Sequence, residues 1–150
     1  MKDPLDILTE WVVWVSLNKK TNLEAILLKG HLLIEITMDR VLSKNGIEKY
    51  KDFSFYRKIQ FLKSIEVYNN SDIELVISFL EEINSLRNKL AHEVLYDVEN
   101  GEFEKWSFSV LENFKGTKFS KYTYRTKIVH SFSVLSRNIL EICETEFTDN

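Results

Sequence analysis

The sequence has little of what disulfide-rich and β-rich proteins need. Its 150 residues include one cysteine, one proline and four glycines. A single cysteine excludes an internal disulfide and is typical of proteins in a reducing compartment. So few prolines and glycines are unusual in a β protein, because many of its turns depend on these two residue types. The composition therefore points away from a small secreted protein and from an all-β fold.

Long apolar runs and a strong net charge are also missing. The mostly apolar stretch 11–17 follows acidic residues and is far shorter than the roughly 18 residues of a membrane-spanning helix. It therefore predicts neither a membrane span nor a secretory signal. The net charge of −3 gives the whole molecule no attraction to nucleic acid, so any contact with a polyanion must be local. We expect a cytoplasmic protein.

The sequence does contain an ordinary share of apolar residues in helical order. Hydrophobic residues make up 44% of the chain and charged residues 29%, as in typical globular proteins. Apolar positions recur every three or four residues, which predicts helices at 4–18, 22–43, 55–67, 71–94 and 120–147. Segment 102–114 also fits a helix, but its aromatic residues leave a strand open. We expect an all-α, single-domain bundle of five or six helices over residues 1–150, in which the helix within 1–20 could be an accessory or partner-binding element.

Polar residues with capping geometry mark the expected helix starts. Thr21-x-x-Glu24 and Ser71-x-x-Glu74 both have the spacing of a capping box, in which two side chains bond the first free backbone N–H groups. Ser54 can cap the helix that follows it. These signals mark where the second, third and fourth predicted helices begin.

The residues best suited to chemistry lie late in the predicted helix 71–94. Arg87 falls in the middle of its apolar stripe, where a charge needs a partner. His92 follows five residues later, about 140° around the helix, so a regular helix does not place the two side chains on one face. Asn88 and His92 are four apart and do share a face.

Three arrangements could still bring Arg87 and His92 into one site. The arginine side chain could bridge the gap, the helix could loosen, or a second subunit could contribute. A two-fold dimer with this helix at its interface would bring two copies of each residue together. By composition alone, the same stretch is also an ordinary solvated helix surface.

Glu35 is a candidate supporting residue. It lies among isoleucines and leucines in the second predicted helix, and a carboxylate in such surroundings needs compensation. It could pair with Arg87, or it could be partly exposed and pair with His31 one turn earlier. The sequence leaves both alternatives open.

A basic, aromatic segment occupies residues 115–127, which contain no acidic residue. Basic side chains supply affinity for phosphate, and aromatic rings stack on unpaired bases. The segment could therefore guide single-stranded RNA, although a solvated loop followed by a helix start would have the same composition. Its candidate RNA-binding residues are Lys118, Lys121, Tyr122 and Arg125.

Other kinds of site find little support. His31, His92 and His130 do not have the spacing of zinc ligands, and one cysteine adds little. No glycine-rich phosphate loop or nucleotide-binding fingerprint is present. We therefore expect neither a metal nor an organic cofactor, and we expect His130 to have a structural role.

Residues 87–92, Arg-Asn-Lys-Leu-Ala-His, resemble the R-x4-H signature of the HEPN superfamily. Segment 30–35 is also similar to the long first core helix of such domains, in which an acidic residue often lies close to the motif. The likeness extends over 22–147 in helical order, although only the six-residue motif is specific. The resemblance implies a small all-α domain, often a homodimer, and in many members a metal-independent ribonuclease of a toxin–antitoxin or antiviral defence system.

The resemblance also implies roles for individual residues. Arg87 would hold the phosphate, His92 would transfer a proton, and Asn88 would assist either of them, with no metal required. In one toxin branch a tyrosine two positions after the histidine is modified by the antitoxin. Here that position is Val94, so this form of regulation is not expected. The alternatives are a non-catalytic HEPN-like module that binds RNA, a nucleotide or a protein, and a helical interaction protein.

Overall fold

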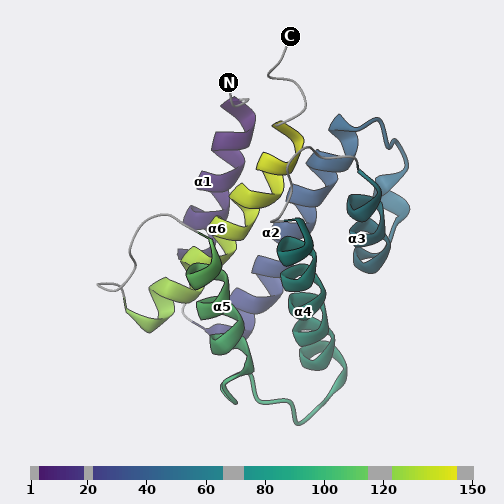
Figure 1. The fold of residues 1–150 in the computed structure, drawn as a ribbon. Helices are drawn as coiled ribbons and strands as arrows, with labels where there is room; N and C mark the ends of the chain where they lie inside the picture. The colour runs from purple at the N-terminus through teal and green to yellow at the C-terminus, as the bar shows by residue number, and fades with distance from the viewer. Residues whose placement is uncertain (1–3, 19–21, 66–72, 115–122, 145–150) are drawn as a thin grey trace.

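The computed structural model describes residues 4–18, 22–65, 73–114 and 123–144, and this part of the chain is helical, with no strand (Figure 1). The elements are α1 (Pro4–Asn18), α2 (Leu23–Lys44), the short 3₁₀ helix η1 (Tyr50–Asp52), α3 (Phe55–Ser64), α4 (Ile73–His92), α5 (Glu102–Asn113) and α6 (Tyr124–Glu144). The prediction of an all-α fold is thus confirmed. The aromatic segment 102–114, for which a strand was open, forms α5.

Capping side chains start the helices as the sequence indicates, with one shift. The Ser54 hydroxyl accepts the backbone N–H of Arg57 at 3.2 Å and so caps α3. At the start of α2 the cap is Asn22 rather than Thr21, because the Asn22 side-chain oxygen accepts the Glu24 N–H at 2.8 Å. The predicted capping residues Thr21 and Ser71 both lie outside the described residues.

The hydrophobic core forms where α2 and α6 cross the other helices. Helix α6 contacts α1, α2 and α5, while α2 also contacts α1, α3 and α4. Gly30 allows the close approach of α2 to α6, because a Cβ atom at this position would lie 2.5 Å from the ring of Phe132. The largest completely buried side chains are Phe103, Phe132, Leu17, Ile26, Leu27, Ile34, Met38, Leu42, Ile59, Leu62, Leu80 and Ile83.

Helix α2 is central, as its nearly continuous apolar character predicts, but one of its faces stays on the surface. Leu28, Leu32 and Ile36 follow each other at every fourth position and remain 44%, 45% and 49% exposed. No helix of the described residues is both long enough and apolar enough to cross a membrane.

The contact between α2 and α4 positions the motif. The C-terminal end of α4 lies beside the first half of α2, and the chain then leaves α4 for the loop to α5 (Figure 1). A contact between His31 of α2 and Asn84 of α4 joins the two helices at this level. The motif 87–92 therefore stands at one end of the bundle, next to α2.

Candidate functional site

The R-x4-H stretch forms the last turns of α4, and His92 is the final residue of this helix. The Glu93 N–H still donates to the carbonyl of Lys89 at 2.9 Å, but Val94 and Leu95 leave the helix and are 99% and 95% exposed. The predicted helix end at Val94 is thus two residues too late. Val94 belongs to the apolar stripe in sequence, yet it finds no packing surface in the structure.

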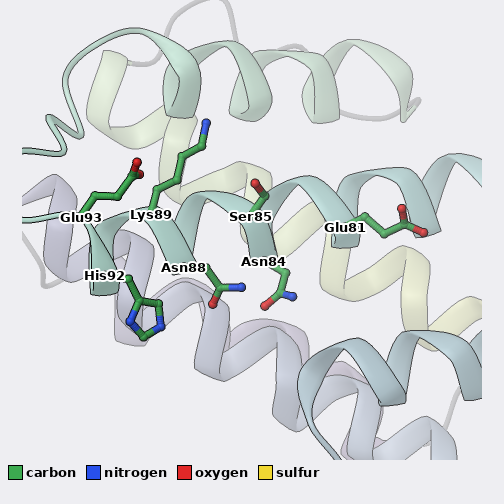
Figure 2. A pocket seen from close by; sticks show the side chains of 7 residues that line it. All are labelled: Glu81, Asn84, Ser85, Asn88, Lys89, His92 and Glu93. Carbon is green, nitrogen blue, oxygen red and sulfur yellow. The ribbon is translucent and has the colours of Figure 1, made fainter.

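A shallow depression of about 450 Å³ lies along this end of α4. We call it the α4 depression; its lining residues are Glu81, Asn84, Ser85, Asn88, Lys89, His92 and Glu93. Figure 2 shows Asn84, Asn88 and His92 in one row turned toward α2, whereas Ser85 and Lys89 project from the other side of the helix. Asn88 and His92 therefore share a face, as their four-residue spacing predicts.

Arg87 lies beside the row rather than in it. Its side chain is half-buried and does not line the α4 depression. Its Nη1 donates to Oδ1 of Asn88 at 3.3 Å. Within the described part of the chain Arg87 has no hydrogen bond or ion pair with His92. Its contact with the row is the hydrogen bond to Asn88. The partner that a charge in the apolar stripe was expected to need is thus the Asn88 amide, and the arginine is only half-buried.

His31 approaches the row from α2, and neither its role nor that of Asn84 was expected from the sequence. Its Nε2 lies 3.0 Å from Oδ1 of Asn84, and its ring stacks on Phe55 with centroids 4.0 Å apart. Burial lowers the pKa of His31; the hydrogen bond to Asn84 opposes this shift, and the charge of Arg87 adds to it. The one sequence signal for Asn84 is its position four residues before Asn88 and eight before His92.

Glu35 has a different partner from either of the two that the sequence suggested. Its Oε2 lies 2.8 Å from Nζ of Lys58, and the same Nζ lies 2.8 Å from Oδ1 of Asp39. Burial alone would lower the pKa of Lys58, but the two carboxylates outweigh it and raise that pKa. Helix α3 thus supplies the cation, so Glu35 forms no ion pair with Arg87 or His31 among the described residues.

Ion pairs neutralise much of the charge around the α4 depression. Lys89 pairs with Glu102 at 3.2 Å, and Glu81 pairs with Lys63 at 3.1 Å. Tyr96, the tyrosine nearest to the motif, donates its hydroxyl hydrogen to Glu102 at 3.3 Å. Burial, followed by the charge of Glu102, raises the pKa of Tyr96. The residues that line the depression are all polar or charged, but together they give it no strong charge of one sign.

Most of the basic segment is outside the part of the chain that the structure describes, including the candidates Lys118, Lys121 and Tyr122. The fourth candidate, Arg125, is half-buried near the start of α6. Close to it, Nζ of Lys127 lies 5.5 Å from the ring centroid of Phe108, and Tyr124 meets the same ring edge-on. The described end of this segment therefore packs on α5.

His130 packs as expected of a structural histidine, since its ring stacks on Trp14 with centroids 4.1 Å apart. Burial lowers its pKa. Among the residues with described positions, no three or more His, Cys, Asp or Glu side chains cluster as metal ligands would.

No protein-family model matches the chain, and no curated protein or solved structure matches it either. Its function is therefore inferred from its own residues.

Proposed function

We propose that the chain is a HEPN-like domain that acts as a homodimeric, metal-independent endoribonuclease on single-stranded or looped RNA. One observation carries the proposal. Asn88 and His92 line one open depression at the end of α4, and the guanidinium of Arg87 bonds to Asn88 from the side. A cation, an amide and a histidine are thus adjacent on a surface that a flexible RNA strand can reach.

These groups suit cleavage of RNA by its own 2′-hydroxyl. The 2′-oxygen attacks the adjacent phosphorus, the P–O2′ bond forms, and the P–O5′ bond breaks. His92 can remove the 2′-hydroxyl proton or deliver a proton to the departing O5′. Arg87 can hold the non-bridging oxygens, on which negative charge develops, with its planar fork of donors. The products would be a 2′,3′-cyclic phosphate and a 5′-hydroxyl, and this reaction requires no metal.

A second copy of the chain would complete this site. The reaction needs one group that accepts a proton and one that donates a proton, whereas each α4 depression contains a single histidine. Val94 and Leu95 are exposed apolar side chains directly beyond His92, where a partner would cover them. A two-fold dimer formed at this end of α4 would bring two His92 and two Arg87 together.

The resemblance to HEPN ribonucleases also suggests the setting. The chain would be the cytoplasmic toxin or effector of a toxin–antitoxin or antiviral defence module, with an antitoxin or another defence protein as partner. The basic segment 115–127 would guide the RNA toward the motif. Its contribution should weaken steeply with added salt, because phosphate contacts release counterions.

The second candidate function is a non-catalytic HEPN-like module that binds RNA, a nucleotide or a protein. The charge balance of the α4 depression favours the protein-binding form of this module, because Glu81 and Glu93 line the depression and Lys89 is already paired with Glu102. A site with these neighbours attracts a polyanion less than a purely basic one would.

Growth of cells that express the chain distinguishes the two functions. An active ribonuclease should slow growth, and His92→Ala should relieve the toxicity. Ser85→Ala provides a matched control, since Ser85 lines the same depression on the other side of α4. Harmless expression of the wild type at the same protein level would favour the binding module.

A further inference from the structure

Asn84, Asn88 and His92 form a regular row along α4. They occupy positions i, i+4 and i+8, so the row extends about 12 Å along the helix axis. All three side chains line the α4 depression and turn toward α2 (Figure 2). The R-x4-H motif includes only the last two members, which leaves Asn84 without an assigned role.

The carbonyl oxygens of both amides are already occupied. Oδ1 of Asn88 accepts from Nη1 of Arg87 at 3.3 Å, and an arginine can only donate. Oδ1 of Asn84 lies 3.0 Å from Nε2 of His31, so His31 donates from this nitrogen. A histidine that donates from Nε2 therefore fixes the orientation of the Asn84 amide from α2.

This arrangement leaves the two NH₂ groups as donors. Within the part of the chain that the structure describes, neither Nδ2 has a hydrogen-bond acceptor. A ligand for the row must therefore provide acceptors. Phosphodiester oxygens only accept hydrogen bonds, whereas most protein surfaces and base edges offer both donors and acceptors.

The charged residues around the row are compatible with a phosphodiester as its ligand. Glu81, at the end of the row near Asn84, is paired with Lys63 at 3.1 Å, so its charge is largely compensated. Glu93 lies at the far end, next to His92 and on the other side of α4 (Figure 2). The first two members of the row, Asn84 and Asn88, have Arg87 nearby, and the acid next to Asn84 is the paired Glu81.

We propose that Asn84 binds the RNA backbone at the phosphate next to the one that is cleaved, and that His31 is the positioning residue that holds its amide. This inference rests on the proposed ribonuclease function, since it assigns a neighbouring subsite to the same centre. His92 and Arg87 act on the scissile phosphate. Asn84 donates from Nδ2 to a non-bridging oxygen of the adjacent phosphate and so fixes the register of the strand.

Binding of a fluorescent 2′-O-methyl RNA oligonucleotide to the full chain tests this subsite, because that RNA lacks the 2′-hydroxyl and stays intact. Asn84→Asp keeps the shape and the oxygen that accepts from His31 but removes the NH₂ donor. Ser85→Asp adds the same charge to the same depression on the other side of α4 and is the matched control. We expect Asn84→Asp to weaken binding about tenfold more than Ser85→Asp does.

Two substitutions of His31 test the positioning role. His31→Phe keeps an aromatic ring against Phe55 but has no donor for Asn84, whereas His31→Gln keeps a donor. His31→Phe should weaken RNA binding about tenfold, and His31→Gln should restore most of the affinity. Thermal denaturation of each variant separates this effect from loss of folding, and Asn84→Asp tests the subsite even if His31→Phe does not fold.

The possible failures are distinguishable. Equal affinity of Asn84→Asp and Ser85→Asp, with a wild type that cleaves unmodified RNA, would overturn the Asn84 subsite and leave the ribonuclease intact. Equal losses for His31→Gln and His31→Phe would overturn the positioning role alone. A wild type that neither binds the modified RNA nor cleaves the unmodified one would overturn both the subsite and the proposed function.

Discussion

Lys58 is the most deeply buried charged side chain among the described residues, with 4% of its side chain exposed. Its Nζ lies 2.8 Å from Glu35 of α2 and 2.8 Å from Asp39 one turn later. Two carboxylates compensate the cost of burying one ammonium group, and the three groups join α2 to α3. Loss of the cation would leave two adjacent, partly buried negative charges without a partner.

Lys58→Met should therefore destabilise the fold by roughly 2 to 4 kcal/mol. Methionine keeps most of the length and apolar contact of lysine, so the loss reports the missing charge. Lys63→Met, on the same helix as Lys58, is the matched control: it removes the exposed ion pair between Lys63 and Glu81 of α4 and should cost less than about 0.5 kcal/mol. Urea denaturation measures both values, and equal losses would contradict the bridging role of Lys58.

His31 should make the stability depend on pH. Burial lowers its pKa below the ordinary value of 6.5, so the unfolded chain binds a proton more readily than the folded chain. The stability contributed by the neutral ring is complete above pH 6.5 and is lost as the pH falls toward the lower, folded pKa. Buried His130 adds a shift of the same sign.

His31→Gln should flatten this dependence, because glutamine does not titrate and can still donate to Asn84. The free energy of unfolding should fall less between pH 7.5 and pH 5.5 in the variant than in the wild type. The part due to His130 should remain in both. A variant with the full wild-type slope would show that His31 titrates alike in the folded and unfolded chain.

For single residues, the sequence predicts only contacts between side chains of the same helix. The common face of Asn88 and His92 follows from a four-residue spacing. The Lys58–Glu35 pair and the His31–Asn84 contact join residues 23 and 53 positions apart, so they depend on how α2 lies against α3 and α4. Helical periodicity does not contain that information.

At the scale of the helices, Gly30 controls how closely α2 approaches α6. A Cβ at this position would lie 2.5 to 2.7 Å from three ring atoms of Phe132, which is completely buried. Elsewhere in a helix, alanine in place of glycine gains about 1 kcal/mol. Here the ring has no free space to move into, so overpacking opposes that gain.

Gly30→Ala should therefore destabilise the fold by a net ~1 to 2 kcal/mol in spite of its better helix propensity. Lys29→Ala, at the exposed neighbouring position, should change the stability by less than about 0.5 kcal/mol. The shift in denaturation midpoint gives both values. A Gly30→Ala variant more stable than the wild type would show that the α2–α6 contact is looser than described.

Helix starts were easier to predict than the end of α4. Ser54 caps α3 as expected, and the cap of α2 is displaced by one residue because Asn22 reaches the Glu24 N–H. A cap involves only two or three neighbouring residues, so its signal is local. Helix α4 ends at His92 because the following apolar residues have nothing to pack against, which only the tertiary structure reveals.

At the scale of the whole molecule, the all-α architecture follows from apolar periodicity, but the faces left uncovered do not. The exposed row on α2 and the exposed Val94 and Leu95 carry the same kind of residues as the core. Whether an apolar face is buried depends on which helix lies opposite to it. Such uncovered faces are where a second copy of the chain could bind.

The proposed dimer at the end of α4 leads to a prediction about molecular mass. The chain has a mass of 17.8 kDa, and light scattering should give twice this value for the wild type. Leu95→Glu should shift the mass toward the monomer, because it places a charge in the proposed interface. Trp11→Glu, which alters an exposed apolar residue on α1, should leave the dimer unchanged. A monomeric wild type at all concentrations would contradict the shared site.

The most direct test of the ribonuclease is an analysis of RNA ends after incubation with the purified chain in the presence of a metal chelator. We expect wild-type protein to cut single-stranded RNA and to leave 2′,3′-cyclic phosphate and 5′-hydroxyl ends. His92→Ala and Arg87→Ala should abolish this cleavage while the variants keep the wild-type melting profile. An intact RNA with the wild type, or equal cleavage by wild type and His92→Ala, would contradict the ribonuclease centred on the end of α4.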